Sequence, residues 1–167
     1  MKTIQVYDYS VKVGARIGKS KKTKCYVDPC NGSKVILIST DPIKEAMSEV
    51  SDKMVHFRGV EYVARGVYRM ERLVVQQSLF PRLNVQAIDL YRALRKCSQS
   101  GQCTNYTTTY RTLAPIGVDF PKAWEEIEHI LGWVSNWSYD IRFEISPRNV
   151  SADAQGNLIL LDVFYIR

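Results

Sequence analysis

The chain has 167 residues, of which 46% are hydrophobic and 24% are charged, the composition of an ordinary globular protein. Because no run of about eighteen apolar residues occurs and the N-terminus lacks a signal peptide's apolar core, we expect an intracellular protein without a membrane span, in the cytoplasm. The formal net charge of +6, from 23 lysines and arginines against 17 aspartates and glutamates, favours acidic partners such as nucleotide phosphates, nucleic acid or an acidic protein surface.

The cysteines and histidines do not form a recognisable metal motif. The sequence contains four cysteines and two histidines, Cys25, Cys30, Cys97, Cys103, His56 and His129. The cysteine spacings do not match common zinc sites, and neither histidine is near enough in sequence to complete one. We therefore expect structural or incidental thiols, and no disulfide in a reducing cytosol.

The first forty residues predict a β-rich segment. Apolar residues alternate over residues 1–13, which indicates a strand or an extended arm. A glycine-containing basic loop at 14–20 leads through further lysines into a second strand at 25–27. Asn31-Gly32 marks a turn. Residues 34–39 are then predicted as a third strand.

A helix and two more strands follow. Asp41-Pro42 has the features of a helix start, an aspartate N-cap and a proline in the first turn, and predicts a helix with its body at 43–53. Residues 57–60 and 62–70 are predicted as strands. The second of these leads towards Glu71 and a hinge, where backbone groups could hydrogen-bond an adenine ring.

The middle of the chain is predicted to be mainly helical. Apolar residues at helical spacing predict helices over 85–97 and 121–137, separated by a polar loop at 98–109. The apolar stripe of the second helix includes Trp124, and we interpret the tryptophans of this helix as core residues.

The most informative stretch is 143–164, which contains a proline loop, a glycine-centred turn at Gln155-Gly156-Asn157 and an apolar strand. Glu144 ends one strand, Asn149 starts the next, and Asp162 ends the last. Three oxygen-bearing side chains are therefore expected at one edge of one hairpin. The simpler alternative is a hairpin with a solvated asparagine and a helix-capping aspartate.

This order of residues is the pattern of a kinase catalytic loop followed by its metal-binding strand. In that pattern the acid, Glu144, accepts a proton from the substrate hydroxyl. Asn149 and Asp162 then hold Mg²⁺ against the phosphates, because a hard cation prefers oxygen ligands.

Two stretches, residues 17–38 and 143–164, together make the chain similar to the protein kinases that short-tailed bacteriophages express early in infection. The resemblance implies an α+β, protein-kinase-like fold with an antiparallel β-sheet lobe and one helix at 1–72. A truncated, mainly helical lobe carrying the hairpin is expected at 73–167, since the chain stops five residues after Asp162. The implied role is host takeover or the blocking of a host defence. The implied cofactors are ATP and Mg²⁺, and the alternative is that neither is bound.

The resemblance also implies a nucleotide loop at Gly18, Lys19, Ser20 and Lys21, but the pattern departs from a kinase at several places. The strand lysine that anchors phosphates is replaced by Leu37, the catalytic aspartate by Glu144 and the second loop glycine by Ser20. The histidine and arginine that usually precede the acid are not in register, and Asp140-Ile141-Arg142-Phe143 stands there instead. A loop lysine could replace the missing cation from among Lys19, Lys21, Lys22 and Lys24. The alternative is that these lysines form a solvated basic hairpin.

Three functions remain open on the sequence. The first is a catalytically weak or inactive kinase-like protein that binds a host protein with an acidic surface. The second is a minimal Mg²⁺-ATP-dependent serine/threonine phosphotransferase. The third, a basic nucleic-acid-binding protein, has less support because the lysines and tyrosines are dispersed.

Overall fold

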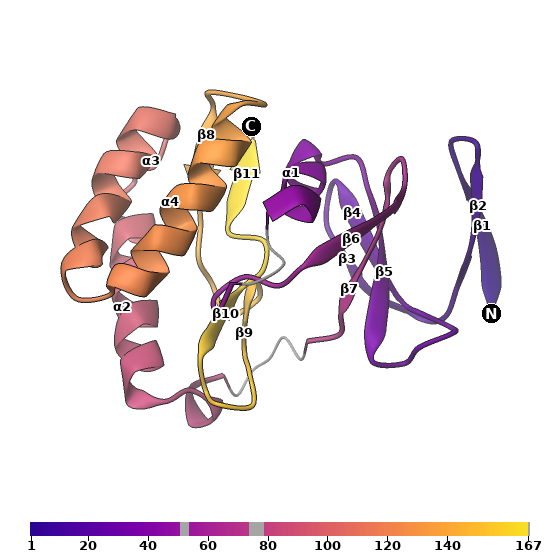
Figure 1. Ribbon diagram of the computed structural model, residues 1–167, viewed down its shortest axis with the longest axis horizontal. Coiled ribbons are helices and arrows are strands. Elements are labelled where there is room, and N and C mark those ends of the chain that lie inside the picture. The colour runs from indigo at the N-terminus through magenta and orange to yellow at the C-terminus, as the bar shows by residue number, and fades with distance from the viewer. Residues whose placement is uncertain (51–53, 74–78, 167) are drawn as a thin grey trace. The chain divides into compact units, whose positions relative to one another are not determined.

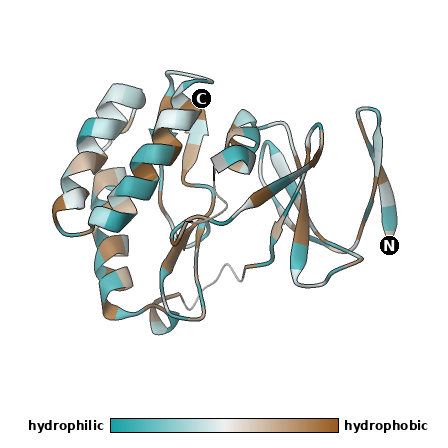
Figure 2. Ribbon diagram, viewed as in Figure 1, coloured by the Kyte–Doolittle hydropathy of each residue, from teal (hydrophilic) through white to brown (hydrophobic). Residues whose placement is uncertain are grey.

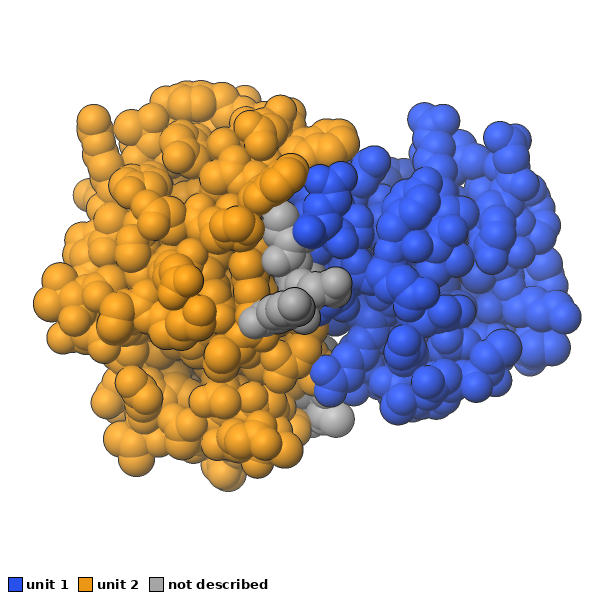
Figure 3. Space-filling model, viewed as in Figure 1, with its two compact units in different colours: residues 1–52, 59–72 blue, residues 53–58, 73–167 orange. Residues whose placement is uncertain are grey.

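A computed structural model describes residues 1–50, 54–73 and 79–166, with the side chain of Val50 outside the description. The chain forms two compact units, shown in different colours in Figure 3. Unit 1 comprises residues 1–52 and 59–72, and unit 2 comprises residues 53–58 and 73–167. The sequence prediction also placed a boundary after residue 72, but it did not separate the segment 53–58 from the first part of the chain.

Unit 1 is built on a five-stranded antiparallel sheet (Figure 1). Its strands, in the spatial order β3-β4-β5-β7-β6, are β3 (Arg16–Lys19), β4 (Thr23–Val27), β5 (Lys34–Ser39), β7 (Val67–Glu71) and β6 (Val60–Ala64). The predicted strand at 34–39 is confirmed as β5. The predicted loop at 14–20 is wrong for residues 16–19, which form β3 because their backbone pairs with β4.

The N-terminal segment is a hairpin of its own, β1 (Lys2–Val6) and β2 (Tyr9–Val13), which pair along their full length. Tyr7 makes the turn with a φ of 50°, which is uncommon for a residue other than glycine. Apolar side chains of the hairpin form one cluster with side chains of the sheet: Val6, Val11, Val13, Tyr26, Ile36 and Val67. The hairpin therefore covers the face of the sheet to which Ile36 points.

Helix α1 (Pro42–Val50) begins where the sequence predicts it. The carboxylate oxygen Oδ1 of Asp41 accepts a hydrogen bond from the backbone N–H of Ile43 at 3.1 Å, as expected of an N-terminal capping residue. The predicted end of the helix, at residues 51–53, lies outside the described residues.

The predicted strand at 57–60 is wrong for residues 57–59. The adjacent backbone N–H groups of Val55 and His56 donate to the carboxylate of Glu126 at 2.8 and 2.7 Å, and the carbonyl of His56 accepts from Leu160. These bonds hold the segment to unit 2, so that the sheet strand β6 starts only at Val60. Strands β6 and β7 then form a hairpin around Gly66, whose φ is 74°.

Unit 2 is mainly helical. Its helices are α2 (Val85–Gln99), α3 (Tyr106–Leu113) and α4 (Pro121–Ser135), with 3₁₀ turns η1 (Phe80–Arg82) and η2 (Ala114–Val118). Helices α2 and α4 confirm the two predicted helices, and both carry hydrophilic and hydrophobic residues (Figure 2). The predicted loop at 98–109 is wrong from residue 106, where α3 begins behind a capping box made by Asn105 and Thr108.

The apolar stripe of α4 is buried as predicted at Ile127, Ile130, Leu131 and Val134. Trp124, the tryptophan of the predicted stripe, is half-buried, whereas Trp133 is 38% exposed and Trp137, just beyond the helix, is 47% exposed. Neither of these two indoles is a core side chain, because the stripe that faces the interior is already filled by aliphatic residues.

The C-terminal part of unit 2 contains two antiparallel pairs, one of β8 (Ile141–Phe143) with β11 (Phe164–Ile166) and one of β9 (Val150–Ala152) with β10 (Leu158–Leu160). The β9–β10 hairpin and its turn at Gly156 confirm the sequence prediction. The described part of the chain is thus a mixed α+β protein with antiparallel sheets and four α-helices. None of the helices it contains has the length and apolar character needed to cross a membrane.

Candidate functional site

The loop between β8 and β9 brings the three predicted site residues together. The side-chain amide nitrogen Nδ2 of Asn149 donates to the backbone carbonyl of Glu144 at 2.9 Å and to that of Asp162 at 3.3 Å. Two backbone hydrogen bonds connect the same segments: the N–H of Glu144 donates to the carbonyl of Val163, and the N–H of Leu161 donates to the carbonyl of Asn149. The expected convergence of residues 144, 149 and 162 in unit 2 is therefore present at the level of the backbone.

The side chains of this loop fit a magnesium ion only in part. Glu144 and Asp162 are exposed carboxylates, which suit a hard cation. The amide oxygen Oδ1 of Asn149, however, already accepts a hydrogen bond from Ser146 N–H at 2.7 Å, so the asparagine acts as a brace of the loop. Among the described residues, no group of three or more histidine, cysteine, aspartate or glutamate side chains could hold a metal ion.

Leu37, where the resemblance to kinases predicts a phosphate-binding lysine, lies in the middle of β5. Its side chain is 6% exposed, and its register partners are Cys25 on β4 and Tyr68 on β7. Burial raises the pKa of Tyr68 to about 12, with further contributions from Glu45, Tyr62 and other nearby groups. Leu37 is therefore buried within the sheet, and a leucine there cannot neutralise a phosphate.

The predicted nucleotide-loop residues divide between the two faces of the sheet. Gly18 pairs with Cys25, which also pairs with Leu37, so these three residues share one face. Lys19 follows Gly18 on β3, and its partner Lys24 precedes Cys25 on β4. Because successive residues of a strand point to opposite faces, both lysines point away from the face that carries Leu37. The replacement of the missing cation by a loop lysine stays a prediction.

The remaining predicted residues lie in the β3–β4 turn and at the end of β7. Ser20 closes the turn, donating its N–H to Thr23 O at 2.7 Å, and Lys21 is exposed in it. Glu71 is the last residue of β7 and lies opposite Lys34 of β5, whereas the first residue of β6, Val60, lies opposite Met70.

One cation near the Leu37 face was missed by the sequence prediction. Lys44 of helix α1 is only 7% exposed. Burial raises the pKa of the Cys25 thiol, and the charge of Lys44 opposes this rise in part, so the ammonium group acts on the face that Cys25 shares with Leu37. The burial of Lys44 could have been inferred from its position, because it directly follows Ile43, a residue on the buried face of the predicted amphipathic helix.

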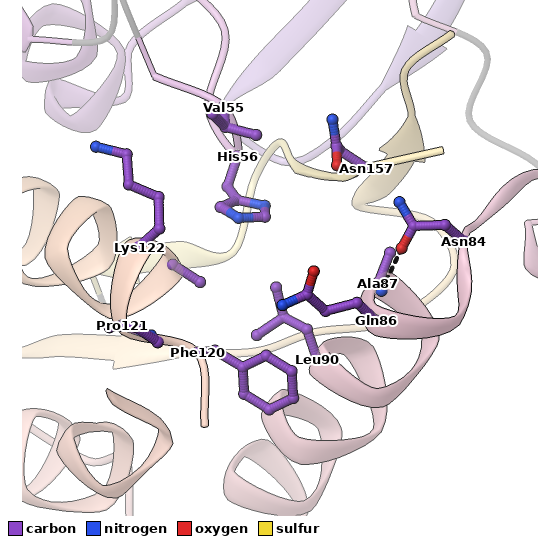
Figure 4. A pocket seen from close by; sticks show the side chains of 11 residues that line it. Val55, His56, Asn84, Gln86, Ala87, Leu90, Phe120, Pro121, Lys122 and Asn157 are labelled. Carbon is purple, nitrogen blue, oxygen red and sulfur yellow. Dashed lines mark hydrogen bonds between the residues drawn. The ribbon is translucent and has the colours of Figure 1, made fainter. Parts of the chain in front are cut away.

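The sequence prediction also did not include a pocket of about 260 Å³ in unit 2, which is shown in Figure 4. His56, Gln86 and Phe120 are among its lining residues, which come from residues 55–56, the N-terminal parts of α2 and α4, and Asn157 of the C-terminal hairpin. The Nδ1 atom of His56 lies 2.7 Å from the carbonyl oxygen of Leu158, which can only accept, so Nδ1 carries a proton and donates it to this carbonyl. The backbone of His56 is fixed by Glu126, which is buried.

Comparison with the models of known protein families, and with curated proteins, finds no match to this chain.

Proposed function

We propose that the chain is a kinase-like protein, similar to those that short-tailed phages express early in infection, which acts by binding a host protein rather than by transferring phosphate. The observation that carries the proposal is the bracing of the 144–149 loop by the side chain of Asn149, which contacts the carbonyls of both Glu144 and Asp162. A hairpin with a solvated asparagine, the simpler alternative, would not make these contacts.

The architecture of each unit also supports a kinase-like fold. Unit 1 has the expected antiparallel sheet with helix α1 between β5 and β6, and unit 2 has the expected helices followed by a β-hairpin. A fold does not by itself determine the chemistry, so the site decides between the binding role and catalysis.

Two properties of the site argue against phosphate transfer. The strand position that should carry a cation is the buried Leu37, and loss of such a phosphate clamp removes transition-state stabilisation of several kcal/mol, or about 10²–10³ in rate. In addition, Glu144 is one methylene longer than aspartate, and a displacement of about 1 Å in a catalytic base costs on the order of 10² in rate.

The second candidate is an active, minimal ATP-dependent phosphotransferase, and the burial of Lys44 favours it. A cation supplied by helix α1 could take over the phosphate contact that Leu37 cannot make. Glu144 would act as the base and Asp162 as the carboxylate that binds the metal.

The binding role is tested by affinity capture from a bacterial lysate at low and at physiological salt. We expect one host protein in stoichiometric amount, with less captured as salt rises, because a basic chain attracts an acidic surface by screened charges. The captured protein is then incubated with the chain and Mg²⁺-ATP, and we expect it to stay unphosphorylated. Absence of a stoichiometric partner at both salt concentrations would count against the proposal.

A further inference from the structure

Unit 1 contains a basic pocket of about 410 Å³, which we call the lysine pocket. Four lysines line it, Lys19, Lys21, Lys22 and Lys24. The β1–β2 hairpin provides the opposite side through Gln5 and Tyr7, and Tyr26 and Ile38 of the sheet also line it. The pocket therefore lies on the face of the sheet that the hairpin covers, away from Leu37.

The local structure explains why the lysines gather there. Lys19 and Lys24 are direct cross-strand neighbours on one face of the β3–β4 pair, and the two residues of the turn, Lys21 and Lys22, lie between them. Like charges placed opposite each other on adjacent strands destabilise a sheet. The arrangement therefore costs folding free energy, and a bound anion would remove that cost.

The rest of the lining suits an anion that accepts hydrogen bonds. None of the described residues that line the pocket is acidic, and Thr40 adds a hydroxyl group, whereas the hydroxyl of Thr23 is hydrogen-bonded to Ser39 and that of Ser20 to the backbone of Thr23. Lysine ammonium groups are point charges on flexible stems, which can adapt to several oxygens without a fixed geometry.

We propose that the lysine pocket binds a chain of phosphate groups, without a metal ion. Four cations around one cavity match a ligand of high charge density, such as a triphosphate, in which neighbouring phosphates share a bridging oxygen. An extended acidic peptide is a poorer match, because side chains on one side of it are spaced roughly 7 Å apart and carry one charge each. The proposal does not depend on the kinase-like function, because the lysines face away from Leu37.

The test is calorimetric titration with inorganic tripolyphosphate at physiological salt in the presence of EDTA. The pocket variant is Lys19→Gln/Lys24→Gln. The matched control is Lys2→Gln/Lys12→Gln, which removes the same charge from exposed hairpin lysines outside the pocket lining. We expect about tenfold weaker binding or more in the pocket variant and about the wild-type affinity in the control. The melting temperature of the unliganded pocket variant should equal or exceed that of the wild type, because a like-charge pair has been removed.

Further arms of the titration identify the source of the phosphates. ATP and a single-stranded oligonucleotide are titrated in the same buffer, and the ligand whose binding is lost in the pocket variant but kept in the control carries the natural phosphate chain. Equal losses in the two variants, no tripolyphosphate binding by the wild type, or tighter binding of a glutamate-rich peptide than of tripolyphosphate would each overturn the proposal. If the pocket variant does not fold, Lys21→Gln in the exposed turn is judged by the same criteria.

Discussion

At the scale of single residues, the carboxylate of Asp153 organises the turn between β9 and β10. Its Oδ1 atom accepts the backbone N–H groups of Gln155 and Asn157 at 2.9 and 2.8 Å, and its Oδ2 atom accepts the side-chain amide of Asn157 at 2.9 Å. Partial burial of this carboxyl group raises its pKa, but these hydrogen bonds and the nearby charge of Arg58 outweigh burial, and the net pKa is lowered. The ionised form is therefore stabilised by folding.

Replacing the carboxylate by an amide in Asp153→Asn should lower the free energy of unfolding at pH 7 by about 1–3 kcal/mol, because the turn loses a charged acceptor of several hydrogen bonds. A group whose folded pKa is lowered stabilises the fold above its unfolded pKa, here 3.8, and loses that effect as the pH falls through the folded pKa. Urea denaturation at pH 7 and at about pH 3 measures both effects. A difference between variant and wild type that is as large at low pH as at pH 7 would contradict this assignment.

The contacts of Asn149 also belong to this scale. The sequence spacing predicted that residues 144, 149 and 162 lie close together, and the structure brings their backbones together through one amide. The spacing could not reveal that the amide oxygen is taken by Ser146 N–H. A hydrogen bond within a loop depends on the path of the backbone, which residue types alone do not determine.

At the scale of elements, the β9–β10 turn packs against the segment that leads into α2. Gly156 has a φ of 81°, and its carbonyl accepts a hydrogen bond from the backbone N–H of Asn84 at 2.9 Å. A Cβ atom at this position would lie 2.8 Å from that same nitrogen and 3.2 Å from the carbonyl oxygen of Arg82. The site thus requires glycine for two reasons, the backbone conformation and the space available.

The two reasons are separated by comparing Gly156→Ala with Gly101→Ala, because Gly101 has a similar φ of 71° but no atom within 4 Å of the place that a Cβ would occupy. We expect Gly101→Ala to destabilise by about 1–2 kcal/mol, the cost of a left-handed alanine. Gly156→Ala should cost about 1–3 kcal/mol more, since backbone atoms must shift. Thermal or chemical denaturation of the two variants gives both values, and equal losses would show that the close approach to Asn84 is unimportant.

Elements with a strong local signal were predicted from the sequence, and those without one were not. Asp41-Pro42, the strand at 34–39 and the Gly156 turn each carry such a signal and were found. Helix α3 was missed because its first turn is rich in threonine, and its capping box uses Thr108 in place of the usual glutamate or glutamine. The lysines were assigned to a loop because the pairing of β3 with β4, which decides the faces of Lys19 and Lys24, is a tertiary property.

At the scale of the whole molecule, the four cysteines are free thiols in very different surroundings. Cys30 is exposed, Cys25 and Cys97 are half-buried, and Cys103 is buried. Burial is the main cause of a raised pKa at Cys25, Cys97 and Cys103, which reduces the fraction of reactive thiolate at neutral pH.

We therefore expect one fast-reacting thiol per native chain, Cys30, and three slow ones when the protein is titrated with a chromogenic disulfide reagent at pH 7. In denaturant all four should react at similar rates. Cys30→Ser should remove the fast phase and leave the slow one unchanged. Two or more fast thiols in the native wild type would show that the described packing around the others is incorrect.

We propose that this chain acts by binding a host protein and not by transferring phosphate. The most direct measurement is the transfer of label from γ-labelled ATP, with Mg²⁺, to the captured host protein and to a general protein substrate, with Asp162→Ala assayed beside the wild type. The account predicts that the wild type transfers no more label than Asp162→Ala. Label that depends on Asp162 would contradict it and would establish the chain as an active phosphotransferase.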